Sequence, residues 1–249
     1  MIPSSRSPWF VGRFSGHVRA RLRRSFSRFA VAGLERTRAL VAAGPFVVVS
    51  NHSAWWDPLV ALHVCHDLLG AEGHAWMDAG NLARLSFFQR IGAFGVDRAD
   101  PSDGARGIRH AARLLRAPGR VVWVFPQGKE RPVAVRPLGF EKGAFAVARV
   151  AKVPVVPVAI DYAFGALETP EIHVAFGEPR PAPRDVATAC SEAERDVEAL
   201  LGTIVSARDG DGSASSFTSL WSTPKEDGVA SAVLARMFPL RGLRADGDG

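Results

Sequence analysis

A histidine and an aspartate five residues apart, His52 and Asp57, are the pair in this sequence best suited to acid–base chemistry. A carboxylate beside an imidazole fixes the tautomer of the ring and stabilises its protonated form, so the ring can take a proton from a hydroxyl group. The pair alone is a weak indication, because the same spacing occurs in surface turns where the aspartate caps a helix. The segments around the pair therefore decide how it is interpreted.

The residues next to the pair predict a strand before it and a helix after it. Phe46 to Val49 is an apolar, β-branched run typical of a buried strand, and it is followed by polar residues that include Asn51. Pro58 is tolerated at the first position of a helix, which predicts a helix beginning near Asp57. His52 is thus expected at the carboxyl end of a strand, where open α/β sheets place their ligand sites.

Two further predicted strands end in charged residues that could hold an anion. Gly92 to Val96 leads to Arg98, whose guanidinium could grip a phosphate or form an ordinary surface ion pair. Arg120 to Phe125 runs into a turn rich in glycine, proline and charge, which can present N–H groups and cations to an anion. The residues of this turn with possible substrate contacts are Gln127, Gly128, Lys129, Glu130 and Arg131.

The remaining pattern predicts an α/β fold with a mixed central sheet flanked by helices in one domain. Val153 to Ile160 is a further apolar segment, and its two prolines favour a strand at the sheet edge or an irregular wall over a central strand. Another strand is predicted over 172–176, and helices over 58–69, 102–117, 143–151 and 186–206. We divide the chain into a basic arm (1–40), the domain that carries the chemistry (41–208), and a linker with a helical tail (209–249), whose last helix spans 229–238.

The arm is strongly basic and amphipathic. Nine arginines lie between Arg6 and Arg38, against one acidic residue, Glu35. Apolar residues at intervals of three and four predict one helical face, made of Phe14, Val18, Leu22, Phe26 and Phe29. Such a helix either lies in a membrane interface or packs on its own domain with its basic side in water. The excess of charge favours the first, on a surface with anionic lipids.

Composition restricts the possible partners and compartments. The 249 residues are 47% hydrophobic and 22% charged, as in a globular protein, and the net charge of +6 indicates nucleic acid, a membrane surface or an acidic substrate as partner. Cys65 and Cys190 form no motif, which favours a reducing compartment. No run reaches the roughly 18–20 apolar residues of a membrane-spanning helix, and no secretory signal is evident. His63 and His66 share a helical face without further ligands, so no metal site is predicted.

Four segments in a fixed order, each at a predicted strand end, resemble the glycerolipid acyltransferase family that includes 1-acylglycerol-3-phosphate acyltransferases. The resemblance covers about residues 40–180, and the order of the segments is far more specific than any one of them. They are Asn51-His52-x4-Asp57, Gly92-Ala93-Phe94-Gly95-Val96-Asp97-Arg98, Phe125-Pro126-Gln127-Gly128 and Val153-Pro154-Val155-Val156-Pro157-Val158.

This resemblance implies transfer of a fatty acyl chain from acyl-CoA or acyl-carrier protein to a hydroxyl of a lysophospholipid or related lipid, as in phospholipid biosynthesis. It implies His52 and Asp57 as the catalytic pair, Arg98 as a contact of the acceptor phosphate, and no cofactor besides the acyl donor. The expected location is the cytoplasmic face of a membrane, with peripheral or monotopic attachment. The third segment departs from the family pattern Phe-Pro-Glu-Gly-Thr-Arg, because Gln127 replaces the Glu and Lys129 the Thr.

The departure leaves three alternatives open. Glutamine keeps the shape of glutamate, loses its charge and gains an NH2 donor, so a different acceptor, such as a glycosylated lipid, is one alternative. A thioesterase or hydrolase with the same His52/Asp57 pair is the second. The third, a non-catalytic membrane or nucleic-acid binding module, explains the basic arm but leaves the four segments without a role, so nucleic acid is not the expected partner. No Ser or Cys lies in a GxSxG pattern, and no acyl-enzyme is expected.

Overall fold

An eight-stranded mixed sheet forms the centre of the computed structural model, which describes residues 1–165, 167–210 and 216–222. The strand order is β4-β3-β5-β2-β6-β7-β1-β8. The strands are β1 (Arg28–Ala32), β2 (Phe46–Ser50), β3 (Glu72–Asp78), β4 (Ala93–Val96), β5 (Arg120–Val124), β6 (Val155–Ala163), β7 (Glu171–Phe176) and β8 (Thr218–Ser222).

The strands from β4 to β6 in this order run parallel to one another. Beyond them β7 is antiparallel to β6, β1 is parallel to β7, and β8 is antiparallel to β1. Parallel strands are joined by crossovers that cover both faces of a sheet, so the sequences of these strands are continuous apolar runs. β2 fits this rule, because all five of its residues are buried.

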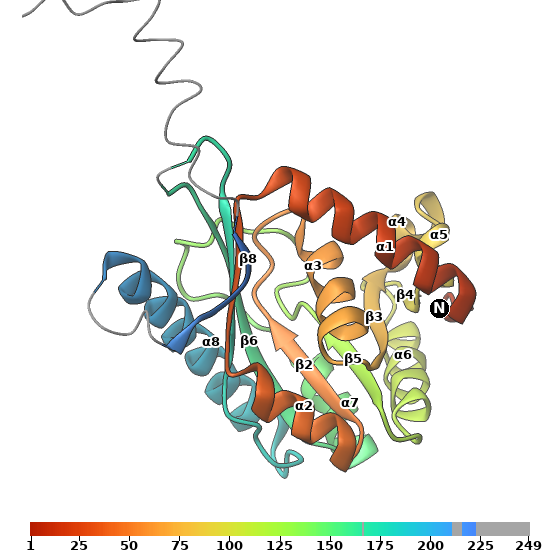
Figure 1. Ribbon diagram of the computed structural model, residues 1–249. Coiled ribbons are helices and arrows are strands. Elements are labelled where there is room, and N and C mark those ends of the chain that lie inside the picture. The colour runs from red at the N-terminus through yellow and green to blue at the C-terminus, as the bar shows by residue number, and fades with distance from the viewer. Residues whose placement is uncertain (166, 211–215, 223–249) are drawn as a thin grey trace, which may run out of the picture.

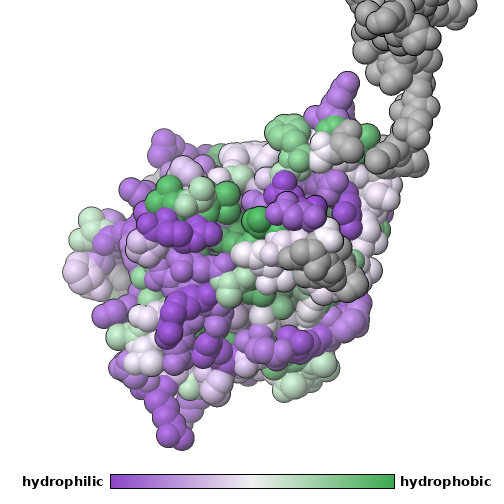
Figure 2. Space-filling view, turned by 90° about the vertical axis from the view of Figure 1, so that its left-hand side faces the viewer, coloured by the Kyte–Doolittle hydropathy of each residue, from purple (hydrophilic) through white to green (hydrophobic). Residues whose placement is uncertain are grey.

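Helices cover the sheet on both faces (Figure 1). They are α1 (Pro8–Ser25), α2 (Leu34–Ala43), α3 (Asp57–His63), η1 (the π-helix Val64–Leu68), α4 (Ala79–Arg84), α5 (Phe87–Arg90), α6 (Pro101–Leu114), α7 (Gly143–Ala151) and α8 (Val186–Asp209). Alternate residues of β2 point to opposite faces. Phe46 and Val48 pack in the core with residues of α1 and α3, whereas Val47 and Val49 pack with residues of α6 and α7. Seen from the side of α8, the surface is mostly hydrophilic (Figure 2).

Most elements predicted from local pattern are confirmed. The strands expected over 46–49, 92–96, 120–125 and 172–176 are β2, β4, β5 and β7, and the helices expected over 102–117, 143–151 and 186–206 are α6, α7 and α8. The helix expected over 58–69 begins as α3 and continues as η1. Most of the predicted linker after Gly210, and the helix predicted over 229–238, lie outside the described residues.

The prediction that the proline-containing strand lies at the sheet edge is wrong. β6 is central, between β2 and β7. The carbonyl of Pro157 accepts a hydrogen bond from Gly177 N at 2.9 Å, just beyond the end of β7. The nitrogen of Pro157, which carries no hydrogen, points toward the same neighbouring strand as its carbonyl. There the ladder with β7 begins only at Val158, opposite Phe176. Pro157 therefore removes no bond from the ladder, and the strand can occupy the middle of the sheet.

The single helical face predicted for the basic arm is also wrong beyond Ser25. The backbone becomes extended at Phe26, and Phe29 lies in β1, completely buried between β7 and β8. Sheet pairing outweighs the helical spacing, because a buried aromatic on a strand gains more from packing than helix propensity offers. The boundary predicted at residue 40 thus falls within α2, after a strand of the sheet.

The apolar face of α1 packs on the domain itself. Val11, Val18 and Leu22 are at most 1% exposed and belong to the core on that side of the sheet. The arginines of the helix lie on its other side, exposed to solvent. The segment was predicted either to lie in a membrane interface or to pack on its own domain. The apolar face of α1 packs on the domain. Within the described part of the chain, no helix has the length and apolar character needed to cross a membrane.

The packing of α1 predicts a large loss of stability when its core residue is truncated. Leu22→Ala removes a fully buried side chain and should lower the free energy of unfolding by about 2 to 5 kcal/mol. Arg24→Ala, two residues along on the exposed side, is the control and should change it by less than about 0.5 kcal/mol. Chemical denaturation measures both. Equal stability of the two variants would mean that α1 is a dispensable arm.

Candidate active site

His52 lies where the sequence predicts, two residues beyond β2 at the carboxyl end of a central strand. The segment from Asn51 to Trp56 leads into α3, which begins at Asp57. Because β5 and β6 flank β2 and run parallel to it, their ends reach the same edge of the sheet. The loop that carries His52 is therefore surrounded by the ends of both neighbouring strands.

The histidine and the aspartate are in direct contact. Nδ1 of His52 lies 2.7 Å from Oδ2 of Asp57, and the aspartate side chain is fully buried while 16% of the histidine side chain is exposed. A buried carboxylate needs hydrogen-bond donors to stay charged. Here the Ser53 and Ala54 N–H groups donate to Oδ2 at 2.7 and 2.9 Å, and the Tyr162 hydroxyl donates to Oδ1 at 2.6 Å. Nδ1–H of His52 is thus directed at Asp57, and Nε2 is the free acceptor.

Tyr162 completes the site from β6, and no sequence motif pointed to it. Burial, together with the neighbouring Asp57 carboxylate, raises the pKa of Tyr162 well above its usual value. The phenol therefore stays protonated and remains a donor to Asp57 over the whole physiological range. Its position at the end of the strand next to β2 is the only signal that could have found it, and that signal requires the strand order.

Asn51, predicted to contact substrate, is instead used to join β2 to β6. It is buried, its Nδ2 donates to the Ile160 carbonyl, and its Oδ1 accepts from the Ile160 N–H, each at 2.8 Å. Both ends of the amide are therefore occupied within the protein. This arrangement fixes the residue directly before His52, so Asn51 positions the loop that carries the histidine.

Gln127 and Arg131 hold the backbone of His52. Gln127 is buried; its Oε1 accepts from the His52 N–H at 2.5 Å, and its Nε2 donates to the Leu138 carbonyl at 3.2 Å. The N–H of Arg131 donates to the His52 carbonyl at 2.9 Å, and its Nη1 donates to the Leu138 carbonyl at 2.6 Å. Both residues were predicted to contact substrate, but the amide of Gln127 and the N–H and guanidinium of Arg131 bind backbone groups of the protein itself.

Arg98 is directed at the same turn. Its Nη1 donates to the Gly128 carbonyl at 2.7 Å, and its Nη2 forms an ion pair with Glu141. Gly128 has a φ of +67°, and a Cβ there would lie 2.3 Å from Nη1 of Arg98. The turn thus requires glycine both for its backbone conformation and for the approach of the guanidinium. No motif indicated that Glu141 would be the partner of Arg98.

The two charged residues between Gly128 and Arg131 are exposed. Lys129 lies at the surface, and Oε1 of Glu130 lies 4.0 Å from Nε2 of His52. The structure thus brings the segment 127–131 together with His52, as the sequence predicts. A carboxylate, however, is the side chain that faces the free nitrogen of the histidine.

Comparison with known proteins agrees with this arrangement. A sequence model of the acyltransferase family matches residues 28–161, more than half of the chain. The chain belongs to this family. Its likeness to glycerolipid acyltransferases, predicted from the four segments, is confirmed.

Three of the relatives are named 1-acyl-sn-glycerol-3-phosphate acyltransferases. The mouse 1-acyl-sn-glycerol-3-phosphate acyltransferase alpha is 31% identical over 117 residues, 46% of this chain and 39% of the relative. The 1-acyl-sn-glycerol-3-phosphate acyltransferase of Bacillus subtilis is 32% identical over 127 residues, 48% of this chain and 57% of the relative. The yeast enzyme of the same name is 25% identical over 122 residues, 48% and 40% of the two chains. The chain therefore spans about half the length of the relatives it matches.

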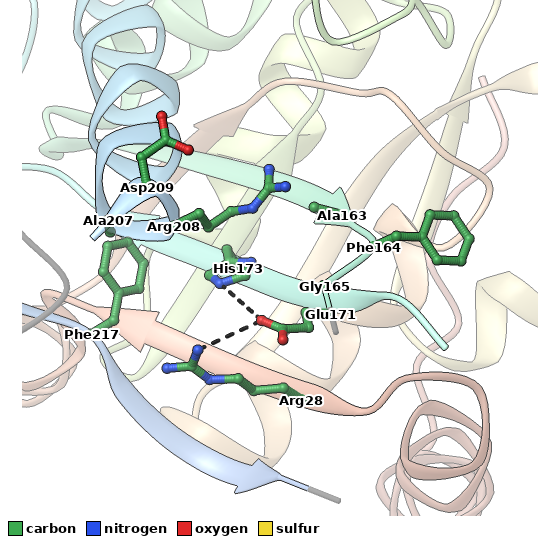
Figure 3. A pocket seen from close by; sticks show the side chains of 10 residues that line it. All are labelled: Arg28, Ala163, Phe164, Gly165, Glu171, His173, Ala207, Arg208, Asp209 and Phe217. Carbon is green, nitrogen blue, oxygen red and sulfur yellow. Dashed lines mark ion pairs between the residues drawn. The ribbon is translucent and has the colours of Figure 1, made fainter. Parts of the chain in front are cut away.

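Two of the cavities in the described part of this acyltransferase-family protein contain charged side chains that bear on the site. One, of about 540 Å³, adjoins Arg98 and has a partly apolar wall that includes Trp76 and Ile108. The other, of about 250 Å³, lies between the ends of β1, β7 and α8 (Figure 3). In it Arg28 and His173 both face Glu171. The larger cavity is the better candidate for substrate, since Arg98 joins it to the turn that holds His52.

The two histidines weighed as metal ligands have other surroundings. His63 is buried, and its Nδ1 lies 2.6 Å from Oδ2 of Asp67. Burial lowers the pKa of His63, and the hydrogen bond to Asp67 opposes this shift. Among the residues that the structure describes, no group of three or more His, Cys, Asp or Glu side chains could hold a metal ion.

The two hydrogen bonds of the Gln127 amide predict that Gln127→Glu weakens the site. A carboxylate can accept from the His52 N–H but cannot donate to the Leu138 carbonyl, so two oxygens would face each other in a buried position. The change should cost about 1 to 3 kcal/mol of folding stability and lower acyl transfer. Thermal denaturation and turnover measure these effects, with Gln89→Glu on α5 as a control for the added charge. Unchanged stability and turnover would show that the amide is not needed to hold His52.

Proposed function

We propose that this protein is an O-acyltransferase that moves a fatty acyl chain from acyl-CoA or acyl-carrier protein to a hydroxyl of a lysophospholipid or a related lipid. The observation that carries the proposal is the contact between Nδ1 of His52 and the buried Asp57 carboxylate, at 2.7 Å. It leaves Nε2 on the accessible side as a base. The match to the acyltransferase family and the names of the relatives support the same chemistry.

In the proposed reaction, Nε2 of His52 takes the proton of the acceptor hydroxyl while its oxygen attacks the carbonyl carbon of the thioester. The new C–O bond forms, the tetrahedral intermediate collapses, and the C–S bond breaks. The proton passes from His52 to the departing thiolate, so an ester and a free thiol result. Asp57 stays charged throughout and stabilises the protonated ring, which is why its donors from Ser53, Ala54 and Tyr162 matter.

We further infer that the protein works at a membrane surface, through side chains around α1 that the core does not use. Trp9 and Trp55 are 68% and 58% exposed, and Phe87 on α5 is also exposed. Arg13 lies over the Trp9 ring at 5.4 Å and Arg21 over the Trp55 ring at 5.7 Å. Tryptophan and arginine are suited to the boundary between lipid head groups and acyl chains.

This α1 surface consists of Trp9, Arg13, Arg21, Arg23, Arg24, Trp55 and Phe87. The Phe14 ring of α1 contacts Phe87 at 5.5 Å, which places α5 beside α1, and Arg21 over Trp55 places the loop after His52 beside it. Trp55 follows His52 by three residues, so the surface adjoins the catalytic loop. A protein docked through this surface would present His52 close to the lipid that carries the acceptor hydroxyl.

The catalytic pair gives the first prediction of the proposed function. His52→Ala should abolish acceptor-dependent thiol release from acyl-CoA, and Asp57→Asn should reduce it by about 10³–10⁴-fold, as in other pairs of this kind. Circular dichroism checks that both variants fold. Thiol release in water without any lipid acceptor distinguishes transfer from hydrolysis. Turnover of His52→Ala close to that of the wild type would exclude the mechanism.

The α1 surface gives the second prediction. Reversing Arg13, Arg21, Arg23 and Arg24 to Glu should weaken co-sedimentation with anionic vesicles, because each basic residue near such a surface contributes about 1 kcal/mol. High salt should have the same effect. Reversing Arg109, Arg113, Arg116 and Arg149, which are exposed on or beside α6 and α7, changes the net charge equally and is the control. Equal loss of binding in both variants would point to net charge alone, without a dedicated surface.

A further inference from the structure

The free nitrogen of the catalytic histidine faces a carboxylate. Nδ1 of His52 is directed at Asp57, and on the other side of the ring Oε1 of Glu130 lies 4.0 Å from Nε2. Half of the Glu130 side chain, 53%, is exposed. Since the acceptor hydroxyl must reach Nε2, the atoms next to that hydroxyl come close to Glu130.

The arginines near this point are turned toward acceptors in the protein. Arg98 binds the Gly128 carbonyl and pairs with Glu141, and Arg131 binds the Leu138 carbonyl. A guanidinium held in this way is less available for a phosphate, because binding one would require it to give up existing hydrogen bonds.

The wall of the cavity beside Arg98 carries more carboxylates than cations. Its charged lining residues are one guanidinium, that of Arg98, and three carboxylates, those of Asp97, Asp100 and Glu141. Glu141 is paired with Arg98 and Asp100 with Arg106, so the charge of Asp97 is the one that these ion pairs leave unbalanced, and it disfavours an anionic group there. The cavity and the surroundings of Nε2 therefore have the same preference.

We propose that the acceptor is an uncharged polyol lipid, in which the carbon next to the reactive hydroxyl bears, or leads to, a second hydroxyl and no phosphate. This inference rests on the proposed acyl transfer and names its acceptor class. The reactive hydroxyl gives its proton to Nε2 of His52, and the second hydroxyl donates a hydrogen bond to Glu130. A phosphate in that place puts a second negative charge within a few ångströms of the Glu130 carboxylate, where like charges repel.

Two acceptors that differ only in the phosphate test the proposal: 1-oleoylglycerol and 1-oleoylglycerol 3-phosphate. Both are presented in micelles of an uncharged detergent, with acyl-CoA as donor and thiol release as readout. We expect kcat/KM to be about tenfold higher for 1-oleoylglycerol, an effect of the size expected for a half-exposed charge near another.

Glu130→Gln keeps the shape of the side chain and removes its charge. It should lower the ratio of the two kcat/KM values about tenfold, by raising turnover of the phosphate. Glu178→Gln, which removes an exposed carboxylate beyond the carboxyl end of β7, is the matched control and should leave the ratio as in the wild type. Lys129→Gln tests the alternative arrangement, in which the exposed Lys129 binds the phosphate of the acceptor.

The outcomes distinguish this inference from the proposed function. The polyol acceptor is overturned, and acyl transfer left intact, if the wild type prefers 1-oleoylglycerol 3-phosphate and Glu130→Gln leaves the ratio of the two kcat/KM values unchanged. The same holds if Lys129→Gln abolishes that preference for the phosphate. Thiol release that neither acceptor stimulates, in a protein that is folded by circular dichroism, overturns the proposed function and this inference with it. Preference for 1-oleoylglycerol that falls in Glu130→Gln and persists in Glu178→Gln supports it.

Discussion

The Asp57 carboxylate is the constraint on which the rest of the site depends. A charged group that is completely buried must be matched by donors, or its burial costs more than the fold can supply. The chain meets this need with two N–H groups of the loop before α3, one imidazole and one phenol. The buried carboxylate is stable only when all of these donors are in place. The orientation of His52 therefore follows from the hydrogen bonds that Asp57 needs.

The order of the strands supplies these donors from distant parts of the chain. β2 lies between β5 and β6, so the loop of His52 meets Tyr162 and the Ile160 backbone on one side. On the other side the ring of His52 stacks on Phe125 at 4.5 Å, and Gln127 binds its N–H. A loop at the carboxyl edge of parallel strands must thus be held in place by side chains, because its backbone groups lie beyond the last hydrogen bond of the sheet and need other partners.

The sequence predicted the parts of this structure that depend on local pattern. The run Phe46 to Val49 and the proline after Asp57 define β2 and the start of α3 without knowledge of any other segment. Two features could not be predicted, because each depends on a partner remote in sequence. Pro157 is central since its missing N–H falls where β7 has ended, and Phe29 is in a strand since β7 and β8 pair with it.

The roles of the polar residues were the least predictable. Residue type showed that Asn51, Gln127 and Arg131 are rich in donors and acceptors, and their place at strand ends suggested contacts with substrate. The same capacity serves equally well to satisfy backbone groups, and which use is made depends on the nearest unpaired group. The Leu138 carbonyl, 11 residues from Gln127 in sequence, is such a group, and no motif contains it.

Charge is distributed in the molecule in a way that composition does not reveal. The net charge of +6 suggests a basic site for an anionic ligand, but the exposed arginines of α1 lie on the outer surface. Near His52 the guanidinium groups of Arg98 and Arg131 face carbonyls or Glu141, and the side chain that faces Nε2 of His52 is Glu130. Two electrostatic regions of opposite sign can serve one reaction, because attraction to an anionic lipid surface acts over a Debye length whereas selection of an acceptor acts over a few ångströms. Attraction of the exposed arginines to an anionic surface and repulsion between Glu130 and an acceptor phosphate, the two effects that we propose, are therefore compatible in one protein.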